Sequence, residues 1–556
     1  MVWSKKTSYC ILSFGLLLFA AFIGILAFFS IYYRKALDYE TTLVNNTILY
    51  NIWKDLPLPI YEKIYFFNVT NAENFINNNE ILKVQEVGPY TYKGSWVKED
   101  ISWLNGTVSY REKKTYHFDK ENSVGSEDDA IYTLNGPLVI ASALLKDKSF
   151  IEKQIADAFF KGNKETLIIK KSVAELAFKG YKDSIIKYGA YIKSDIPYKN
   201  GIFSWLYGKN ATDEGLFTVF TGETDHKKMN FIKEWNGSEK LKFWKDDTCN
   251  MMNGTNAEVG PALMKNQKNY TFFQPLICRS LTFNYSRDLN HNNIFCRRFE
   301  SSTETLASSS INSDNWCFET DLDLKSGTQD LSPCQFGAPV VLTFPHFYLS
   351  DPSYLQNVSG LNPSKNKHGS HIDIAPTIGV SVDLKLRFQM NLKIAQVRYL
   401  SEFEKINPGL YPVFWIEMSA KLTQELADTI IKDIMKPKEV IYSILGIILT
   451  IALVLITGSS LLLCFDQKEL ISEETKPLLD GEHQKAIYYS FSASDEDSTT
   501  SGISNETSAM KFSAEACPVL ITKDNVYLAE SESPENSIEN HSPLSSETPP
   551  MLMAKI

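Results

Sequence analysis

The sequence predicts an α+β membrane protein in which two transmembrane helices flank one large ectodomain. Two long uncharged segments lie near the two ends of the chain, at 10–31 and 440–465. Between them, residues 380–394 alternate without a break between apolar and polar side chains, which is typical of a long amphipathic β-strand. The same region holds nine N-x-S/T sequons, and so many in one segment favour a glycosylated luminal or extracellular domain.

The first uncharged segment is long enough to cross a bilayer. Its 22 residues would form about 33 Å of helix, and the hydrocarbon core is about 30 Å thick. A cleaved signal peptide is the alternative, but its apolar region is usually about 7–15 residues long and ends at a small-residue cleavage site. We therefore predict a cytoplasmic N-terminus at 1–9 and an uncleaved transmembrane helix at 10–33.

The second span, at 440–465, closes an ectodomain of residues 34–439 and places both termini on the same side of the membrane. Neither span contains a charged residue, and because an ion pathway needs polar lining, we do not expect a channel. The sequons place the ectodomain outside and both termini in the cytoplasm. The predicted glycosylation sites are Asn45, Asn68, Asn105, Asn210, Asn236, Asn253, Asn269, Asn284 and Asn357.

The C-terminal tail, residues 466–556, has a composition of its own. It carries 17 acidic and 6 basic residues, whereas residues 1–465 hold 49 acidic and 50 basic ones. The tail is rich in Ser, Thr, Glu and Pro and shows no apolar periodicity, so it is predicted to be a disordered cytoplasmic segment. The nearly neutral body lacks the basic surface that nucleic-acid binding requires.

Five of the eight cysteines lie in one part of the ectodomain: Cys249, Cys278, Cys296, Cys317 and Cys334. Cysteines outside the cytoplasm are expected to form disulfides, and two bridges among five cysteines allow 15 arrangements. Spacing does not choose among them. No CxxC or Cys/His spacing suggests zinc, and no metal or cofactor is predicted.

The alternating segment at 380–394 would form about 50 Å of strand with one apolar and one solvated face. Other strands must cover the apolar face, so we predict a barrel or a sandwich. Further strands are predicted at 340–348 and 217–220, and a hairpin with a type I′ turn at Asn105–Gly106. The apolar face is either ordinary core or the lining of a barrel that is roomy enough to hold a lipid.

Helices are predicted within 149–190, where capping boxes begin at Ser149 and Ser172. Gly162-Asn163 would end the first helix and Gly180 the second. Residues 146–193 contain 11 Lys and 6 acidic residues. This lysine-rich surface is either a solvated face or a patch that attracts anionic ligands.

Catalytic motifs are missing from the sequence. There is no G-x-S-x-G, H-E-x-x-H, P-loop or dinucleotide-binding glycine signature, so no enzyme is predicted and no catalytic residue is assigned. His346 and His371 lie in strand-like segments and are interpreted as structural histidines.

Six short blocks, in this order between two terminal spans, resemble the class B scavenger receptor family, which includes fatty acid translocase and lysosomal integral membrane protein type 2. The blocks are EVGPYTY at 86–92, CNMMNGT at 249–255, ICRS at 277–280, FPHF at 344–347, GLNP at 360–363 and HIDIAPTIG at 371–379. The resemblance covers roughly residues 8–465. It implies an antiparallel β-barrel with a hydrophobic tunnel, capped by an apical helical bundle.

The resemblance also implies roles for particular residues. The lysine-rich helices become the ligand-facing apex, with Lys164 matching the family's apical lysine and Lys161 beside it. The blocks imply the disulfides Cys249–Cys317 and Cys278–Cys334. Glu319 replaces the cysteine of a third family bridge, so Cys296 is left over, either as a buried thiol or as an intermolecular link.

Two further departures are Ala375, where the family often has an acidic residue, and the lack of histidine in 149–190, which argues against a histidine-based pH switch at the apex. In the tail, Glu474, Leu478 and Leu479 resemble an acidic dileucine signal, which adaptor proteins would read. Residues 488–491 resemble a tyrosine-based signal, and 492–501 are candidate phosphorylation sites.

The favoured function is a membrane receptor that binds lipids, lipoproteins or other anionic ligands and passes fatty acid or sterol through the tunnel to the membrane. The alternatives are a lysosomal membrane protein that exports lipid or carries a luminal protein partner, and an adhesion or phagocytic receptor that does not use the tunnel. The location would be the plasma membrane, the lysosomal or endosomal membrane, or both. The sequence leaves a homo-oligomer open.

Overall fold

The computed structural model describes residues 5–56, 58–192, 200–262 and 266–479. The chain divides into two units, Met1–Lys476 and Pro477–Ile556, and everything below concerns the first unit unless stated.

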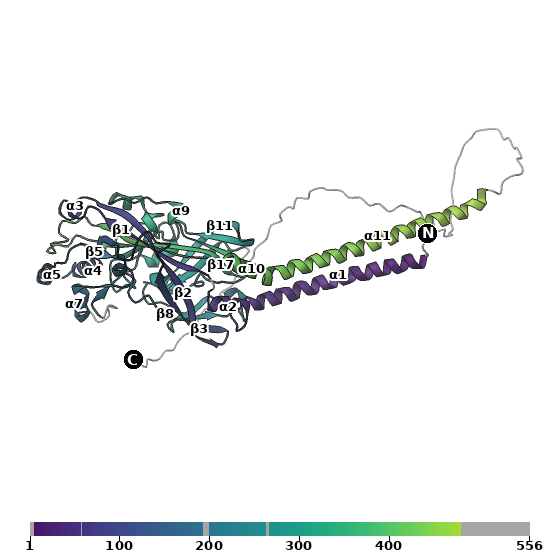
Figure 1. Ribbon diagram of the computed structural model, residues 1–556, viewed down its shortest axis with the longest axis horizontal. Helices are drawn as coiled ribbons and strands as arrows, with labels where there is room; N and C mark the ends of the chain where they lie inside the picture. The colour runs from purple at the N-terminus through teal and green to yellow at the C-terminus, as the bar shows by residue number, and fades with distance from the viewer. Residues whose placement is uncertain (1–4, 57, 193–199, 263–265, 480–556) are drawn as a thin grey trace, which may run out of the picture. The chain divides into compact units, whose positions relative to one another are not determined.

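Two long helices, α1 (Lys5–Glu40) and α11 (Lys436–Leu479), contain the two predicted spans. They lie side by side (Figure 1): the rings of Phe29 and Tyr442 meet edge to face at 5.7 Å, and the Tyr33 hydroxyl donates to the Ile434 carbonyl at 3.1 Å. Both helices extend beyond the predicted spans, because the polar residues that flank them are good helix formers. Residues 466–479 are therefore helical, and the prediction that disorder begins at residue 466 is wrong.

The ectodomain is built on a 14-stranded sheet within the described residues, antiparallel except for one short pairing. Its main path runs β10-β11-β12-β16-β17-β18-β1-β2-β3-β8-β9. These strands span, in chain order, β1 Ile60–Val69, β2 Leu82–Leu104, β3 Thr107–Phe118, β8 Thr212–Phe220, β9 Ile232–Trp235, β10 Asn269–Gln274, β11 Arg279–His291, β12 Ile294–Glu300, β16 His371–Ala375, β17 Val380–Ile394 and β18 Gly409–Lys421. Off this path lie β13 (Gln329–Asp330), β14 (Val340–Thr343) and β15 (Val358–Ser359).

The segment Gly254–Thr255 joins the two edges of this path into a near-barrel. The Ile232 amide of β9 donates to the Gly254 carbonyl at 2.9 Å, and the Phe273 amide of β10 donates to the Thr255 carbonyl at 2.8 Å. Gly254 has φ +83°, and a Cβ there would overlap the Thr271 carbonyl oxygen. A glycine is therefore required where the two edges meet.

The strand predicted at 380–394 is confirmed as β17, but its predicted solvated face is wrong. Arg387, Gln389 and Asn391 on that face are buried as deeply as the apolar side. Arg387 pairs with Glu417 at 2.7 Å, and Gln389 accepts a hydrogen bond from the His346 amide at 2.6 Å. The chain around residue 346 covers this face, which sequence alternation cannot reveal.

The remaining strand predictions are confirmed in part. The hairpin turns at Asn105–Gly106, between β2 and β3, with both residues at positive φ, as a type I′ turn requires. Residues 217–220 lie within β8. The strand predicted at 340–348 ends at Thr343, and Pro345–Phe347 form a 3-10 turn instead, because proline lacks an N–H for the sheet.

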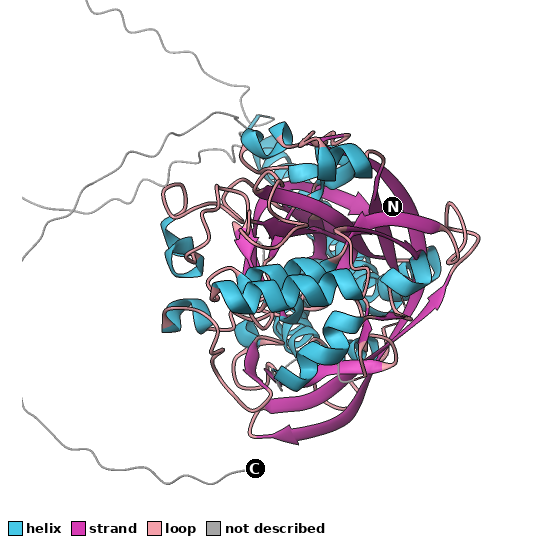
Figure 2. Cartoon of the chain, turned by 90° about the vertical axis from the view of Figure 1, so that its left-hand side faces the viewer, coloured by secondary structure: helices cyan, strands magenta, loops and turns pink. Residues whose placement is uncertain are grey.

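Helices cover one end of the barrel: α4 (Gly136–Leu145), α5 (Phe150–Gly162), α6 (Val173–Leu176) and α7 (Ser184–Ile192). Figure 2 shows them in front of the strands, seen from the end opposite to α1 and α11. Both capping boxes are confirmed, and α5 ends at Gly162 as predicted. The second predicted helix is a single turn that ends at Leu176, not at Gly180. We call this helical end the apex.

Short elements complete the fold. The helices are α2 Ile48–Lys54, α3 Ala72–Asn77, α8 Asp247–Asn250, α9 Lys365–His368 and α10 Gln424–Ile430, followed by the π-helical Ile431–Met435. The remaining 3-10 helices are η1 His226–Lys228, η2 Pro275–Ile277, η3 Ser313–Phe318 and η5 Pro352–Gln356. Two ribbons, β4–β5 (Ala130–Leu134 with Ile168–Ser172) and β6–β7 (Tyr181–Lys182 with Ile202–Phe203), lie among the apical helices.

Candidate functional site

Three cavities follow one another through the barrel, with volumes of about 140, 100 and 20 Å³. The first begins under the apex, beside Ile140 and Leu144 of α4, and the third ends beside Leu56 and Leu58, which follow the membrane-proximal α2. Neighbouring cavities share lining residues: Leu206, Leu276, Met390 and Ile416 join the first to the second, and Met418 joins the second to the third. We call this series the cavity path.

The apolar face of β17 lines the cavity path. Leu386 and Phe388 border the second cavity, Met390 the first and second, and Leu384 the third, while Leu392 and Ile394 are fully buried core. The apolar face of β17 is therefore cavity lining along one part of the strand and ordinary core along another.

The cavities as they stand are smaller than the roughly 300–1,000 Å³ typical of sites for small molecules. A lipid would have to displace side chains, and the junctions are the places where this is easiest. Met390 and Met418 lie at the two junctions, and an unbranched thioether changes rotamer readily.

One wall of the second cavity is polar. It carries Glu62 of β1, Lys114 and Tyr116 of β3 and Glu214 of β8, opposite the apolar wall of β17 and β18. The Lys114 ammonium lies 2.7 Å from Glu214. Burial raises the pKa of Glu62 to about 7, and the Tyr116 hydroxyl and the Lys114 ammonium oppose that rise. The cavity can therefore hold a ligand that has one polar group on an apolar body.

This wall continues into a buried chain of charges toward the third cavity. The fully buried Lys98 ammonium lies 2.7 Å from Glu112 and 2.7 Å from Glu258, and Glu112 lies 3.6 Å from Lys114. Although burial opposes it, the ammonium groups of Lys98 and Lys114 lower the pKa of Glu112. Burial and the neighbouring Glu112 raise the pKa of Glu258, which borders the third cavity, to about 8. Sequence reasoning missed this chain, because Glu258 comes from a loop 160 residues from Lys98 and the hairpin of β2 and β3 does not by itself reveal which of its charges are buried.

The predicted apical lysines are both exposed. Lys161 lies at the end of α5 with its ammonium 2.7 Å from Asp157. Lys164 follows the helix with φ +57°, in the left-handed position that commonly ends a helix. Beside them α5 exposes three large apolar side chains, Phe150, Ile151 and Ile155, at 57%, 67% and 66%. The apex therefore combines cationic and apolar groups, and sequence analysis considered only the cationic ones.

Within the described residues, two clusters contain metal-ligating residue types. In the first, Glu86, His346 and His368 bring their ligand atoms within 4.8 Å of one another. The backbone amide of Asn362 donates to Nδ1 of His346 and that of Ser364 to Nδ1 of His368, each at 3.0 Å. Neutral imidazoles that accept at Nδ1 carry their proton on Nε2, so they present donors and no lone pair to an ion. His346 donates to Glu86 and is structural, as predicted.

The second cluster is His291, Asp373 and Asp383. Arg298 binds both oxygens of Asp373 at 2.6 Å, and His291 lies 2.6 Å from the same carboxylate. His371 lies 3.6 Å from Asp383. These contacts are those of a buried ion-pair network that joins β11, β12, β16 and β17.

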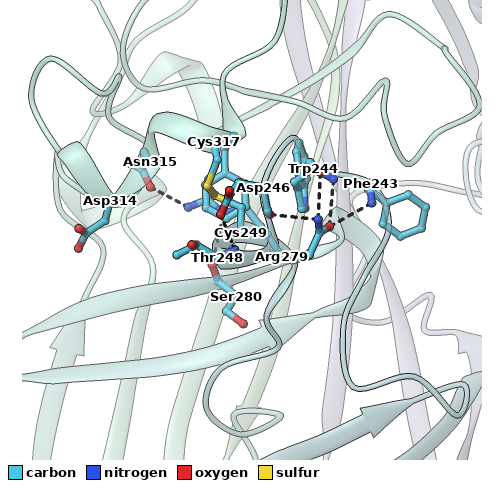
Figure 3. Close-up of a disulfide and its surroundings, with 12 residues drawn as sticks. Phe243, Trp244, Asp246, Thr248, Cys249, Arg279, Ser280, Asp314, Asn315 and Cys317 are labelled. Atoms are coloured by element: carbon cyan, nitrogen blue, oxygen red, sulfur yellow. Dashed lines mark hydrogen bonds between the residues drawn. A yellow bond between two sulfur atoms is a disulfide. The ribbon is translucent and has the colours of Figure 1, made fainter. Parts of the chain in front are cut away.

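Two disulfides join the segments implied by the resemblance: Cys249–Cys317 (Figure 3) with a Cα–Cα distance of 5.9 Å, and Cys278–Cys334 with 6.4 Å. Cys296 on β12 is fully buried, and burial raises the pKa of its thiol to about 12. It is a buried free thiol, which favours the first of the two alternatives over an intermolecular link.

The sequon asparagines lie on the surface of the ectodomain. Asn68 and Asn284 are half-buried and the other seven are exposed. Glu474, Leu478 and Leu479 fall on the last turns of α11. The tyrosine-based motif at 488–491 and the serine-rich run at 492–501 lie outside the described residues.

Comparison with known proteins identifies the fold. The model of the CD36 family matches residues 11–464. The chain belongs to the CD36 family. This confirms the resemblance seen in the sequence blocks. It also makes α1 and α11 the two membrane spans of a CD36-family protein, on either side of its ectodomain in the sequence.

Relatives of this CD36-family chain include scavenger receptors class B member 1 and lysosome membrane proteins 2. Scavenger receptor class B member 1 of Bos taurus is 31% identical over 402 residues, which cover 72% of this chain and 78% of the relative. Lysosome membrane protein 2 of Mus musculus is 32% identical over 404 residues, covering 71% and 83%. The human lysosome membrane protein 2 is 30% identical over 403 residues, covering 71% and 82%.

Proposed function

We propose that this CD36-family protein is a membrane receptor that binds lipids, lipoproteins or other anionic ligands at the apex and passes fatty acid or sterol along the cavity path. The observation that carries the proposal is the continuity of the three cavities from α4 to Leu58, since each shares lining residues with the next. Burying an acyl chain contributes roughly 0.8 kcal/mol per CH₂, so transfer needs no covalent chemistry and no catalytic residue.

The apex supports capture of a lipid surface. Lys161 and Lys164 would attract anionic headgroups, and Phe150, Ile151 and Ile155 would insert among acyl chains. A site for a soluble anion would need only the lysines, whereas a lipid surface would use both the lysines and the exposed apolar side chains beside them.

A lysosomal membrane protein that exports lipid or carries a luminal protein partner is the second candidate. Two observations favour it: the relatives named lysosome membrane protein 2, and the acidic dileucine pattern at 474–479 just beyond the membrane. An adhesion or phagocytic receptor that leaves the cavity path unused is the third.

A blocked cavity path tests the transfer function. Met390→Trp fills the junction between the first two cavities, and Val124→Trp, at a residue 60% exposed, is the matched control. We expect Met390→Trp to reduce uptake of a fluorescent sterol and of a fluorescent fatty acid by transfected cells about tenfold, with cell-surface amount and lipoprotein binding unchanged. Undiminished uptake by a folded Met390→Trp protein would favour the adhesion receptor.

A further inference from the structure

Arg279, the first residue of β11, is a buried cation without an anionic partner. Arg279 is 4% exposed. It directly follows Cys278, which belongs to one disulfide, and it lies beside the other disulfide, Cys249–Cys317 (Figure 3). Two other arginines of the ectodomain do pair with carboxylates: the buried Arg387 with Glu417 at 2.7 Å, and the half-buried Arg298 with Asp373 at 2.6 Å. Among the described residues, no carboxylate lies within ion-pair distance of Arg279.

Neutral groups surround the guanidinium instead. It donates to the side-chain oxygen of Asn315 at 2.9 Å, to that of Gln329, and to the Ser280 carbonyl at 3.3 Å. The ring of Phe318 covers one face at 3.6 Å. Since a guanidinium has five N–H groups, these three acceptors leave two without a partner in the described part of the chain.

The two amides are fixed in their orientation. The Asn315 amide nitrogen donates to the Ala307 carbonyl at 2.9 Å, and that of Gln329 to the Asp330 carbonyl at 3.0 Å. Both amide oxygens must therefore face Arg279. The Cys249–Cys317 disulfide anchors η3, which carries both Asn315 and Phe318. The surroundings of the cation are thus rigid before any ligand arrives.

Two polar cavities, of about 490 and 260 Å³, meet at Arg279, Asn315 and Phe318. Five acidic residues also line them, and none of the five forms an ion pair with Arg279: Glu304, Asp314, Glu319, Asp323 and Asp330. Two of these carboxylates accept from neutral donors, Glu304 from Asn284 at 3.1 Å and Glu319 from the Ser309 amide at 2.7 Å. Three predicted glycan acceptors, Asn253, Asn269 and Asn284, line the larger cavity. Glycans on these asparagines would leave less room for a large ligand than for a small ion.

The charge on Arg279 has to be compensated. Burial lowers its pKa to about 9, so the guanidinium stays protonated at neutral pH. An unpaired buried charge is strongly destabilising. We propose that Arg279 and the polar cavities beside it form a binding site for a small monovalent anion, with chloride as the representative ion.

Thermal unfolding of the purified full-length protein tests this site. At constant pH and ionic strength, replacing sodium gluconate with sodium chloride should raise the Tm by roughly 2 °C, and the rise should level off as the chloride concentration increases. The reason is that a ligand that binds only the folded state stabilises it. Arg279→Gln should abolish the dependence on chloride. Arg111→Gln is the control: it removes the same charge from a surface ion pair with Asp213, and its Tm should still depend on chloride.

Equal Tm values for the wild type in the two salts would overturn the proposal, as would a chloride effect that persists in Arg279→Gln. If that variant does not fold, anomalous scattering from wild-type crystals grown in bromide decides the matter. A bromide peak in contact with the guanidinium supports the site, and a map without one there rejects it. Neither readout involves lipid, so the result is independent of the proposed function.

Discussion

At the scale of single residues, Glu62 shows how the barrel controls a charge beside its cavities. Its pKa is raised from 4.5 to about 7, mainly because burial disfavours the carboxylate. A raised pKa means that the folded state holds the proton more tightly than the unfolded state. The contribution of Glu62 to stability is therefore fully present below about pH 4.5 and is lost as the pH rises through about 7.

Glu62→Gln should remove this part of the pH dependence. We expect the wild type to lose up to roughly 3 kcal/mol more stability than the variant between about pH 5 and pH 8. Thermal or denaturant unfolding of the full-length protein at the two pH values measures the difference. Parallel pH profiles for the two proteins would show that Glu62 ionises freely in the folded state.

Lys164 is an exposed residue whose replacement should affect binding and not folding. Lys164→Glu is expected to weaken binding to anionic phospholipid vesicles about threefold to tenfold, with the Tm unchanged. Lys227→Glu, at an exposed position on η1 near the end of α1, is the control. Equal losses in both variants would mean that net charge matters and the apex does not.

At the scale of elements, closure of the near-barrel depends on one glycine between β9 and β10. Gly254→Ala places a Cβ against the Thr271 carbonyl, at a φ of +83°. Gly237 has a similar φ, +73°, but open space around it, so Gly237→Ala reports the backbone strain alone. We expect Gly254→Ala to lower the free energy of unfolding by about 2 kcal/mol more than Gly237→Ala. Equal losses would show that the two edges can separate without cost.

At the scale of the whole molecule, location decides between the first two functions. Leu478→Ala/Leu479→Ala should move the protein from lysosomes to the cell surface if adaptor proteins read the dileucine pattern at the end of α11. Surface labelling against a lysosomal marker measures the shift, which we expect to be several-fold. If the wild type already resides at the cell surface and the double variant has the same location, the dileucine pattern is not a sorting signal and the plasma-membrane receptor is the function that remains.

Local patterns in the sequence determined much of this architecture. The two spans, strand β17, the Asn105–Gly106 turn and the caps at Ser149 and Ser172 each depend on residues close together in the chain. Hydrophobic periodicity, capping and positive φ act over a few residues, so the sequence alone reveals them. The family blocks added the disulfide pairing and the apical position of Lys164, which spacing could not supply.

Only the tertiary structure decided what lies against these elements. The solvated face expected on β17 is buried because the chain around His346 crosses it. The charges from Glu62 to Glu258 meet because β1, β2, β3 and β8 lie side by side and the loop that carries Glu258 reaches Lys98 on β2. Arg279 lacks a carboxylate because the side chains that contact it are two amides and the ring of Phe318. Burial and charge pairing are set by contacts between residues distant in sequence, so no local pattern records them.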